Sequence, residues 1–234
     1  MLEGRQGDSV ARNGYEPPPE TKNLRKTLAA ALKTKDAEGR VVSSAKHGVY
    51  LFYDYDGEPI YVGQTYERLS SRIRRHLTNQ RTDAVAMNVL DPFEVAEIEM
   101  WPFFELKNAD AEHAKSVLNG AEYAVYRKAI DESRHGAILN EGDIQETDPI
   151  ELPQSVRVPV VPPDLFEERK HPDTRIARRA STIAALARVI SEREVSRGLR
   201  RTLLTQAKRL EYLASTRLDE AEEPVPVQEP GEEV

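Results

Sequence analysis

Apolar and polar positions repeat along this chain with two different periods, and each period predicts a different kind of element. Between His47 and Gly63, aromatic and β-branched residues flank Asp56-Gly57, a pair that is typical of the turn of a β-hairpin. Residues 93–101 alternate apolar and charged positions over most of their length, which predicts a third strand. We therefore expect a small sheet of three antiparallel strands.

Apolar residues at steps of three and four predict the helices. These steps occur in four stretches, 22–35, 67–79, 110–132 and 174–218. In the last stretch Gly198 offers a break, so the pattern fits either a helical hairpin or one long helix. The sequence thus predicts an α/β (α+β) fold, in which helices flank the sheet and a helical segment is appended at the C-terminal side.

Polar and proline-rich stretches divide the chain into six segments. In order, we expect a disordered N-terminus, a basic helix with its connector, the compact domain, a Pro-rich linker, a basic helical segment and an acidic disordered tail, at 1–21, 22–46, 47–148, 149–173, 174–218 and 219–234. Pro-rich chain is a semi-rigid spacer. The linker is therefore expected to pack along the compact domain or to connect it to the helices that follow.

Composition excludes several classes of protein. The 234 residues include no cysteine, which excludes a disulfide scaffold, a zinc ribbon and a thiol nucleophile. No apolar run approaches the ~20 residues that cross a bilayer, and the first residues show no apolar signal region. We therefore expect a soluble, cytoplasmic protein with no membrane partner.

The net charge of −7 is distributed unevenly. Residues 169–217 hold thirteen basic residues against four acidic ones, whereas residues 48–148 hold ten against nineteen. A basic block can follow nucleic-acid phosphates, or it can be a solvated helix face. Its heptad-like apolar positions equally suit a homodimer interface or docking on the compact domain. The sequence leaves the DNA arm, the homodimer and docking open.

Two pairs of residues in and after the hairpin are candidate catalytic residues. Tyr50 and Tyr61 lie on its two strands, and strand pairing can bring such side chains to one face. Arg72 and His76 are four residues apart in the following helix, so both project from one side of it. Taken alone, the tyrosines would be half-buried core residues and the helical pair a solvated surface.

Two further polar residues come later in the chain. Glu122 lies among small and apolar positions of a long helix, where a carboxylate snorkels, pairs with a base or holds a cation. Asn140 ends a short apolar run, where asparagine commonly forms a turn or a cap. Neither residue identifies an activity by itself, so the order of all six has to be considered.

In that order, these residues resemble the GIY-YIG nuclease domain. The Gly-Val-Tyr of 48–50 and the Tyr-Val-Gly of 61–63 flank a hairpin, an Arg-x-x-x-His follows at 72–76, and Glu122 and Asn140 come after it. Both tripeptides have valine where the family has isoleucine. The stretch before the arginine is one residue longer than in typical members. The resemblance covers roughly residues 47–145.

The resemblance implies metal-dependent hydrolysis of DNA phosphodiesters. Glu122 would hold one Mg²⁺ or Mn²⁺, which is chemically sufficient because magnesium needs few protein carboxylates. Tyr50 would accept or relay the proton of the attacking water, and Arg72 would contact the scissile phosphate with its planar fork. A restriction-type enzyme is the first interpretation, with a repair or mobile-element nuclease as the others.

Three residues would support this reaction. Tyr61 would position phosphate or water, and His76 would hydrogen-bond Tyr50 or the nucleophile. Asn140 would brace Tyr50 or the region of Glu122. The alternative is a catalytically silent nucleic-acid-binding or interaction protein that kept the fold.

DNA binding needs local positive charge, because the compact domain is acidic overall. We expect it from basic side chains in and after the first helix of the domain and in the C-terminal helices, namely Arg68, Arg74, Arg75, Arg81, Arg178, Arg179, Arg200 and Arg201. The same side chains could simply form solvated helix faces.

Overall fold

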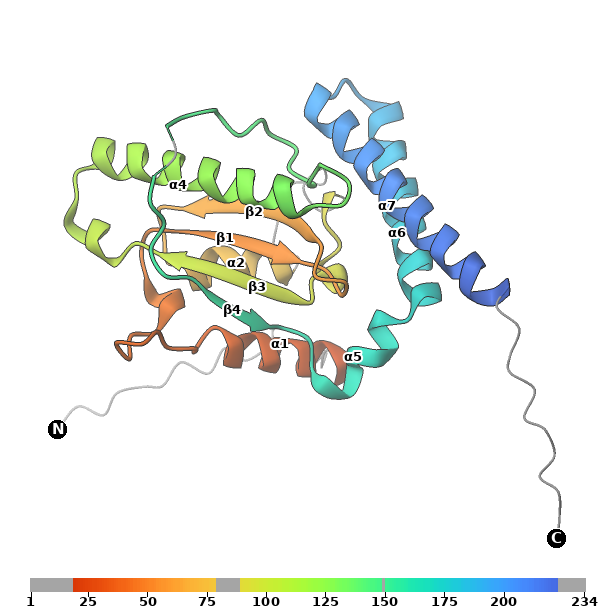
Figure 1. Cartoon of the computed structure of the whole chain (residues 1–234), viewed down its shortest axis with the longest axis horizontal. Helices are drawn as coiled ribbons and strands as arrows, with labels where there is room; N and C mark the ends of the chain where they lie inside the picture. The colour runs from red at the N-terminus through yellow and green to blue at the C-terminus, as the bar shows by residue number, and fades with distance from the viewer. Residues whose placement is uncertain (1–18, 79–88, 149, 223–234) are drawn as a thin grey trace, which may run out of the picture.

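The computed structural model describes three stretches of the chain, residues 19–78, 89–148 and 150–222. At its centre is an antiparallel sheet with the strand order β2-β1-β3-β4 (Figure 1). The strands are β1, Gly48–Tyr53; β2, Pro59–Thr65; β3, Glu97–Pro102; and β4, Val156–Pro159. The predicted α/β class and the antiparallel sheet flanked by helices are confirmed, and the sheet has one strand more than expected.

Helices cover both faces of this sheet. The α-helices are α1, Pro19–Ala31; α2, Leu69–Leu77; α4, Ala111–Glu132; α5, Pro163–Lys170; α6, Pro172–Glu192; and α7, Arg197–Glu222. The 3-10 helices within the described stretches are η1, Val42–Ser44; η2, Pro92–Glu94; and η3, Phe104–Asn108. No helix in the described part of the chain is long and apolar enough to cross a membrane.

Alternate residues of β1 divide the core into two layers. Tyr50 and Phe52 share an apolar cluster with Ile73 of α2 and with residues of α1. Leu51 points the other way and shares a cluster with Leu118 of α4. This is the period of two expected for a strand that is buried on both faces.

The turn of the β1–β2 hairpin forms where the sequence predicts it. The Oδ1 atom of Asp54 accepts hydrogen bonds from the backbone N–H groups of Asp56 (2.9 Å) and Glu58 (3.1 Å). Gly57 has a φ of 71°, a left-handed conformation that glycine adopts without steric cost. The turn fixes the register of the two strands that carry the tyrosines.

The fourth strand lies in the segment that we expected to be a Pro-rich linker. Val156–Pro159 pairs with β3, with Val158 opposite Ile98, and α5 follows in the same segment. The strand is only four residues long, and a proline ends it at the sheet edge, where no ladder hydrogen bond is required. Such a short apolar pattern between prolines gives little periodic signal. The segment therefore completes the sheet before it leads into the C-terminal helices.

Helix ends differ from the expected ones by a few residues. The helix α1 begins at Pro19, and α7 continues to Glu222, so both enter stretches that we expected to be disordered. The helix α4 agrees closely, because Asp110 caps it by accepting a hydrogen bond from the N–H of His113 (2.9 Å). Residues 1–18 and 223–234 lie outside the described part.

The C-terminal helices form a hairpin, and the break precedes the glycine that we singled out. The helix α6 ends at Glu192 and α7 begins at Arg197, so Gly198 lies in the first turn of α7. A Cβ atom at Gly198 would overlap the carbonyl oxygen of Glu141. The glycine therefore allows α7 to approach the backbone of the loop after Asn140, rather than interrupting a helix.

This helical hairpin lies beside the β1–β2 hairpin (Figure 1), and buried ion pairs attach it to the turn. The Oδ2 atom of Asp54 accepts hydrogen bonds from Arg175 (3.1 Å), Arg179 (3.0 Å) and Arg209 (2.7 Å). Arg179 also donates to Glu94 (3.0 Å). Burial opposes the charge of Asp54, but the three guanidinium groups hold its pKa below the usual value. Of the alternatives left open by the sequence, docking is the one that these contacts support.

Candidate active site

The first candidate side chain, Tyr50, lies on the α2 face of β1 and is fully buried. Its hydroxyl oxygen is 2.9 Å from Nε2 of His76. Gly63 lies opposite it in the sheet register. A Cβ atom at Gly63 would lie 2.5 Å from Cζ of Tyr50, so a side chain there would displace the ring. The glycine of the Tyr-Val-Gly tripeptide is thus needed because the phenol crosses its backbone.

Tyr61 and His76 complete an aromatic group with Tyr50. Tyr61 is paired with Phe52, so its ring falls on the same face of the sheet as Tyr50. The ring centroids of Tyr61 and His76 are 5.1 Å apart, and those of the two tyrosines 6.5 Å. The two tyrosines share one face of the sheet, as we expected. His76 contacts Tyr50, which is the first of the two partners expected for it.

Arg72 brings a positive charge to these phenols from α2. Burial opposes that charge, but Tyr50, Tyr61 and Glu122 outweigh it and raise the pKa of Arg72. Its Nε atom is buried and has no hydrogen-bond partner among the described residues. A guanidinium with a donor left over suits an incoming phosphate oxygen.

Glu122 projects from α4 toward the edge strand β2. Its Oε2 atom accepts a hydrogen bond from Nε2 of Gln64 (3.0 Å), and the same nitrogen donates to Oδ1 of Asn119 (3.0 Å). Burial raises the pKa of Glu122 to about 7, against the lowering effect of the Gln64 hydrogen bonds and the charge of Arg72. The hydrogen bonds and the positive charge near Glu122 therefore do not offset the cost of burying its ionised form.

A cavity of about 390 Å³ joins the two sides of the site at the β2 edge. Tyr61 lines it from the sheet, Glu122 lines it from α4, and residues 140–145 form the remaining wall. Arg72 is close enough to Glu122 for the charge of each to shift the pKa of the other. The structure therefore places the Tyr61 phenol and the Glu122 carboxyl group on one cavity, and the charge of Arg72 acts on both.

Asn140 holds the edge strand rather than Tyr50 or Glu122 themselves. Its Oδ1 atom accepts from the N–H of Val62 (3.0 Å), and its Nδ2 atom donates to the carbonyl oxygen of Val62 (2.8 Å). The N–H of Leu139 donates to the carbonyl of Ile60 (2.8 Å), which extends this pairing. The expected bracing is therefore indirect, through the strand that carries Tyr61 and Gln64.

The donor set fits a single hard cation. Among the residues described by the structure, no group of three histidine, aspartate or glutamate side chains could enclose a metal. Mg²⁺ keeps most of its water ligands and needs only one or two carboxylates. Glu122 supplies one carboxylate, whose buried negative charge is only partly offset by its neighbours. The buried Oε1 atom of Gln64 has no hydrogen-bond partner among the described residues. These oxygen atoms suit Mg²⁺ or Mn²⁺.

The basic residues expected on α2 fall into two groups. Arg68 and Arg74 are exposed, whereas Arg75 forms an ion pair with Glu67. Arg81 lies outside the described residues. The exposed pair provides positive charge on the helix that also carries Arg72.

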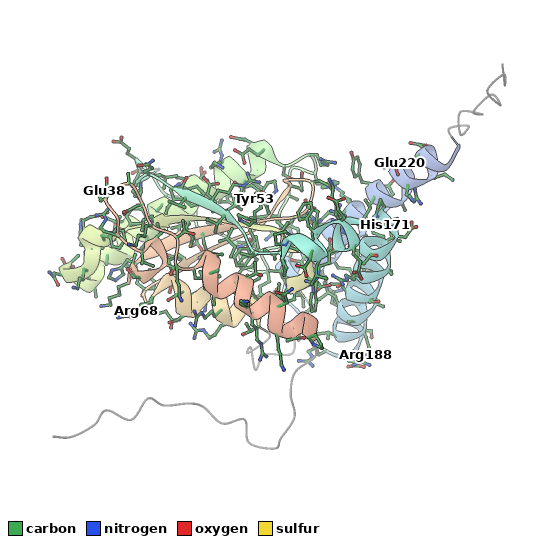
Figure 2. The ribbon with its side chains drawn as sticks, turned by 90° about the horizontal axis from the view of Figure 1, so that it is seen from below. Glu38, Tyr53, Arg68, His171, Arg188 and Glu220 are labelled. Atoms are coloured by element: carbon green, nitrogen blue, oxygen red, sulfur yellow. The ribbon has the colours of Figure 1, made fainter. Side chains whose placement is uncertain are left out.

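The basic residues of the C-terminal helices are less available than expected. Arg179 is 4% exposed and is bound to acidic groups of the compact domain, so it cannot act as a DNA contact in this fold. Arg178 stacks on Phe93, with its Cζ atom 4.9 Å from the ring centroid. Arg201 pairs with Asp143 (2.8 Å), and Arg200 is exposed. Figure 2 places Arg68 and Arg188 at opposite ends of the molecule, so the two basic regions do not form one short strip.

Sequence reasoning missed two residues of the site, Gln64 and Asn119. Gln64 directly follows Gly63, so the alternation of β2 points it to the opposite face, toward α4. Asn119 is three residues before Glu122 and shares its helix face. The same two periodicities that located the helix and the strand could have found both.

Comparison with known protein families matches the part of the chain that contains the hairpin and α2. Residues 46–110 match the model of the GIY-YIG catalytic domain. Comparisons with curated proteins and with solved structures gave no match. The matched residues include Tyr50, Tyr61, Arg72 and His76 and end before Glu122, which the fold returns to the same cavity. This stretch of the chain is therefore similar to the catalytic domain of GIY-YIG nucleases.

Proposed function

We propose that the protein is a metal-dependent DNA endonuclease that hydrolyses phosphodiester bonds at the β2 edge. The observation that carries this proposal is a cavity lined by Tyr61 and the buried carboxyl group of Glu122, with Arg72 and Tyr50 close enough to interact electrostatically beside it. An anionic phosphate needs the guanidinium, and a divalent cation needs the carboxylate. The two together fit the chemistry of a phosphodiester better than that of a neutral substrate.

Each side chain has a role in the proposed reaction that follows from its position. Arg72 binds non-bridging phosphate oxygens and is strongest where charge accumulates in the transition state. The Tyr50 hydroxyl holds or passes on the proton of the attacking water, and its contact with Nε2 of His76 offers that proton a second site. Tyr61 lines the cavity and orients phosphate or water.

Glu122, with Gln64 beside it, would hold Mg²⁺ or Mn²⁺. When bound, the ion supplies positive charge to the phosphate and acidity to water. Asn140 keeps β2 in place, because its side-chain oxygen accepts from the N–H of Val62 and its side-chain nitrogen donates to the carbonyl of Val62. Displacement of that strand would move Tyr61 and Gln64 together.

A plasmid assay tests the proposal directly. Supercoiled DNA should be nicked or linearised with Mg²⁺ or Mn²⁺ and should remain intact with a chelator. Glu122→Ala should abolish cutting while its circular dichroism spectrum stays that of the wild type. Cutting by a folded Glu122→Ala variant, or cutting in the chelator, would contradict the metal role. An uncut plasmid with retained DNA binding would favour a catalytically silent binding protein.

We propose a restriction-type role for this activity, in the cytoplasm. The support is the docked C-terminal hairpin, which is packed on the catalytic domain through buried ion pairs rather than carried on a flexible tether. Sequencing the ends of the cleavage products tests this. One recurring sequence at the ends is expected, whereas ends set by branches or nicks would favour a repair or mobile-element enzyme.

A homodimer through α7 is the second partner that we propose. Two leucines, Leu204 and Leu218, are 57% and 60% exposed on that helix. They lie fourteen residues apart, which brings them near one side of the helix. The mass in solution should be that of two chains and should fall to one in Leu204→Glu. A monomeric wild-type protein would remove this proposal.

A further inference from the structure

We propose that Gln64 is a positioning residue for the cation: its carboxamide, held by Asn119, fixes the Glu122 carboxylate in the orientation that receives the ion. The inference rests on the proposed function, because it concerns the same carboxyl group. It adds a residue that lies in β2 rather than in the helix that carries the ligand.

The fold brings these three side chains together from two elements. In the register of the sheet Gln64 lies opposite Val49, and Val49 belongs to the cluster that packs on α4. Its side chain therefore leaves β2 on the α4 side, whereas Gly63 faces Tyr50. Asn119 and Glu122 are three residues apart on α4 and meet it from the helix.

Hydrogen-bond capacity fixes which way the carboxamide points. Its Nε2 atom has two hydrogens, and it donates to Oε2 of Glu122 and to Oδ1 of Asn119, both at 3.0 Å. Rotating the amide by half a turn would place its oxygen against these two acceptors, which is unfavourable. Asn119 therefore determines the orientation of Gln64, and Gln64 in turn determines that of Glu122.

Packing alone does not hold the Glu122 carboxyl group, because it borders a cavity of about 390 Å³. Without the bond from Gln64, the carboxyl group could adopt other rotamers that the open space permits. With the bond, Oε2 is occupied and the second oxygen remains for the ion. Removing a partner of this kind commonly weakens metal binding 10- to 100-fold, so we expect about a tenfold effect here.

The test measures Mn²⁺ binding to the full chain without DNA, from the electron paramagnetic resonance signal of free Mn²⁺. The variant is Gln64→Met, which keeps the length of the side chain and removes its donor. We expect about a tenfold higher Kd than in the wild type. The Mn²⁺ concentration at half-maximal cleavage should rise by the same factor, and kcat should return to the wild-type value at saturating Mn²⁺.

A matched control is Gln154→Met. Gln154 is exposed and does not line the cavity. This variant should bind Mn²⁺ like the wild type. Equal weakening by both substitutions would overturn the inference, because the effect would then not be specific to Gln64.

Glu122→Gln separates failure of this inference from failure of the proposed function. Loss of Mn²⁺ binding in Glu122→Gln, with an unchanged Kd in Gln64→Met, overturns only the role of Gln64. Unchanged binding in Glu122→Gln overturns the metal assignment and this inference with it. A lower melting temperature in Gln64→Met with an unchanged Kd would show a purely structural residue and would also overturn the inference.

Discussion

Two regions of this molecule place arginine near a buried carboxylate. They differ in how far the neighbouring groups offset the negative charge of that carboxylate. At the docking cluster, Asp54 is bound by three buried arginines, and its pKa is lowered. At the cavity, Glu122 has an amide donor in Gln64 and the charge of Arg72 to favour its ionised form, but burial still raises its pKa to about 7. The charged form of Asp54 is therefore favoured within the chain, whereas that of Glu122 is disfavoured.

The comparison shows that residue type alone does not separate a structural ion pair from a site. Residues 169–217 contain thirteen of the 33 basic residues, yet three of these arginines attach the hairpin to the compact domain. An unpartnered donor does not separate them either, because Arg72 near the cavity and Arg209 in the docking cluster both keep donors without a partner among the described residues. The two regions differ in the carboxylate, since the pKa of Asp54 is lowered and that of Glu122 is raised.

The largest effect should come from removing the charge at the docking cluster. Asp54→Asn leaves three buried guanidinium groups around a neutral amide, so we expect the free energy of unfolding to fall by about 3–5 kcal/mol. Denaturation in urea measures this. The control is Glu192→Gln, which removes an exposed pair with Arg188 (3.6 Å) and should cost at most about 1 kcal/mol. Equal losses in both variants would contradict the distinction drawn between the regions.

Removing the guanidinium of Arg72 should lower the cleavage rate strongly and the stability only slightly. Arg72→Ala should lower the cleavage rate at least about 100-fold, because a transition-state charge partner contributes about 3 kcal/mol. Its urea midpoint should change little compared with that of Asp54→Asn. The measurement is a single-turnover rate at saturating metal. Cleavage by Arg72→Ala at a rate near that of the wild type would show that the phosphate is held elsewhere.

Acid should weaken the docking cluster in a defined direction. Because the pKa of Asp54 is lower in the folded protein, its contribution to stability is present above the ordinary value of about 4 and is lost as the pH falls through the folded value. The difference in unfolding free energy between wild type and Asp54→Asn should therefore shrink as the pH drops below about 4. A constant difference down to pH 2 would mean that Asp54 does not titrate there. Glu94, whose pKa burial raises, shifts stability the other way and is common to both proteins.

The smallest effect should come from an exposed basic residue. Arg74→Ala removes a side chain on α2 that can reach a phosphate, so the log-log slope of DNA affinity against salt should decrease by about 0.9. Arg179→Lys should leave that slope unchanged, because its side chain is buried. Binding is measured with Ca²⁺ in place of Mg²⁺ at several salt concentrations. A reduced slope in Arg179→Lys would contradict docking in solution.

Much of the catalytic half could be predicted from local patterns. The Asp56-Gly57 turn, the helix after it and the long helix beginning at Asp110 all carry strong short-range signals, and the structure has each of them. The ordered residues of the motif then gave the family. Such signals suffice where neighbours in the sequence determine the structure.

The remaining features depend on long-range contacts, which a single sequence does not encode visibly. The strand β4 is recognisable only by its pairing with β3, because four residues between prolines show no clear period. The bond between Asp54 and Arg209 joins residues 155 positions apart. Charge counts showed that the C-terminal helices are basic, but not which arginines would be buried.

The contact between Gly198 and the carbonyl of Glu141 has a practical consequence for shortening this protein. The loop that contains Glu141 forms one wall of the catalytic cavity, and the first turn of α7 lies directly behind it. A fragment cut at the borders of the family match would therefore lose the backing of that wall. The smallest piece worth expressing as an enzyme extends to the end of α7, well beyond the residues that identify the family.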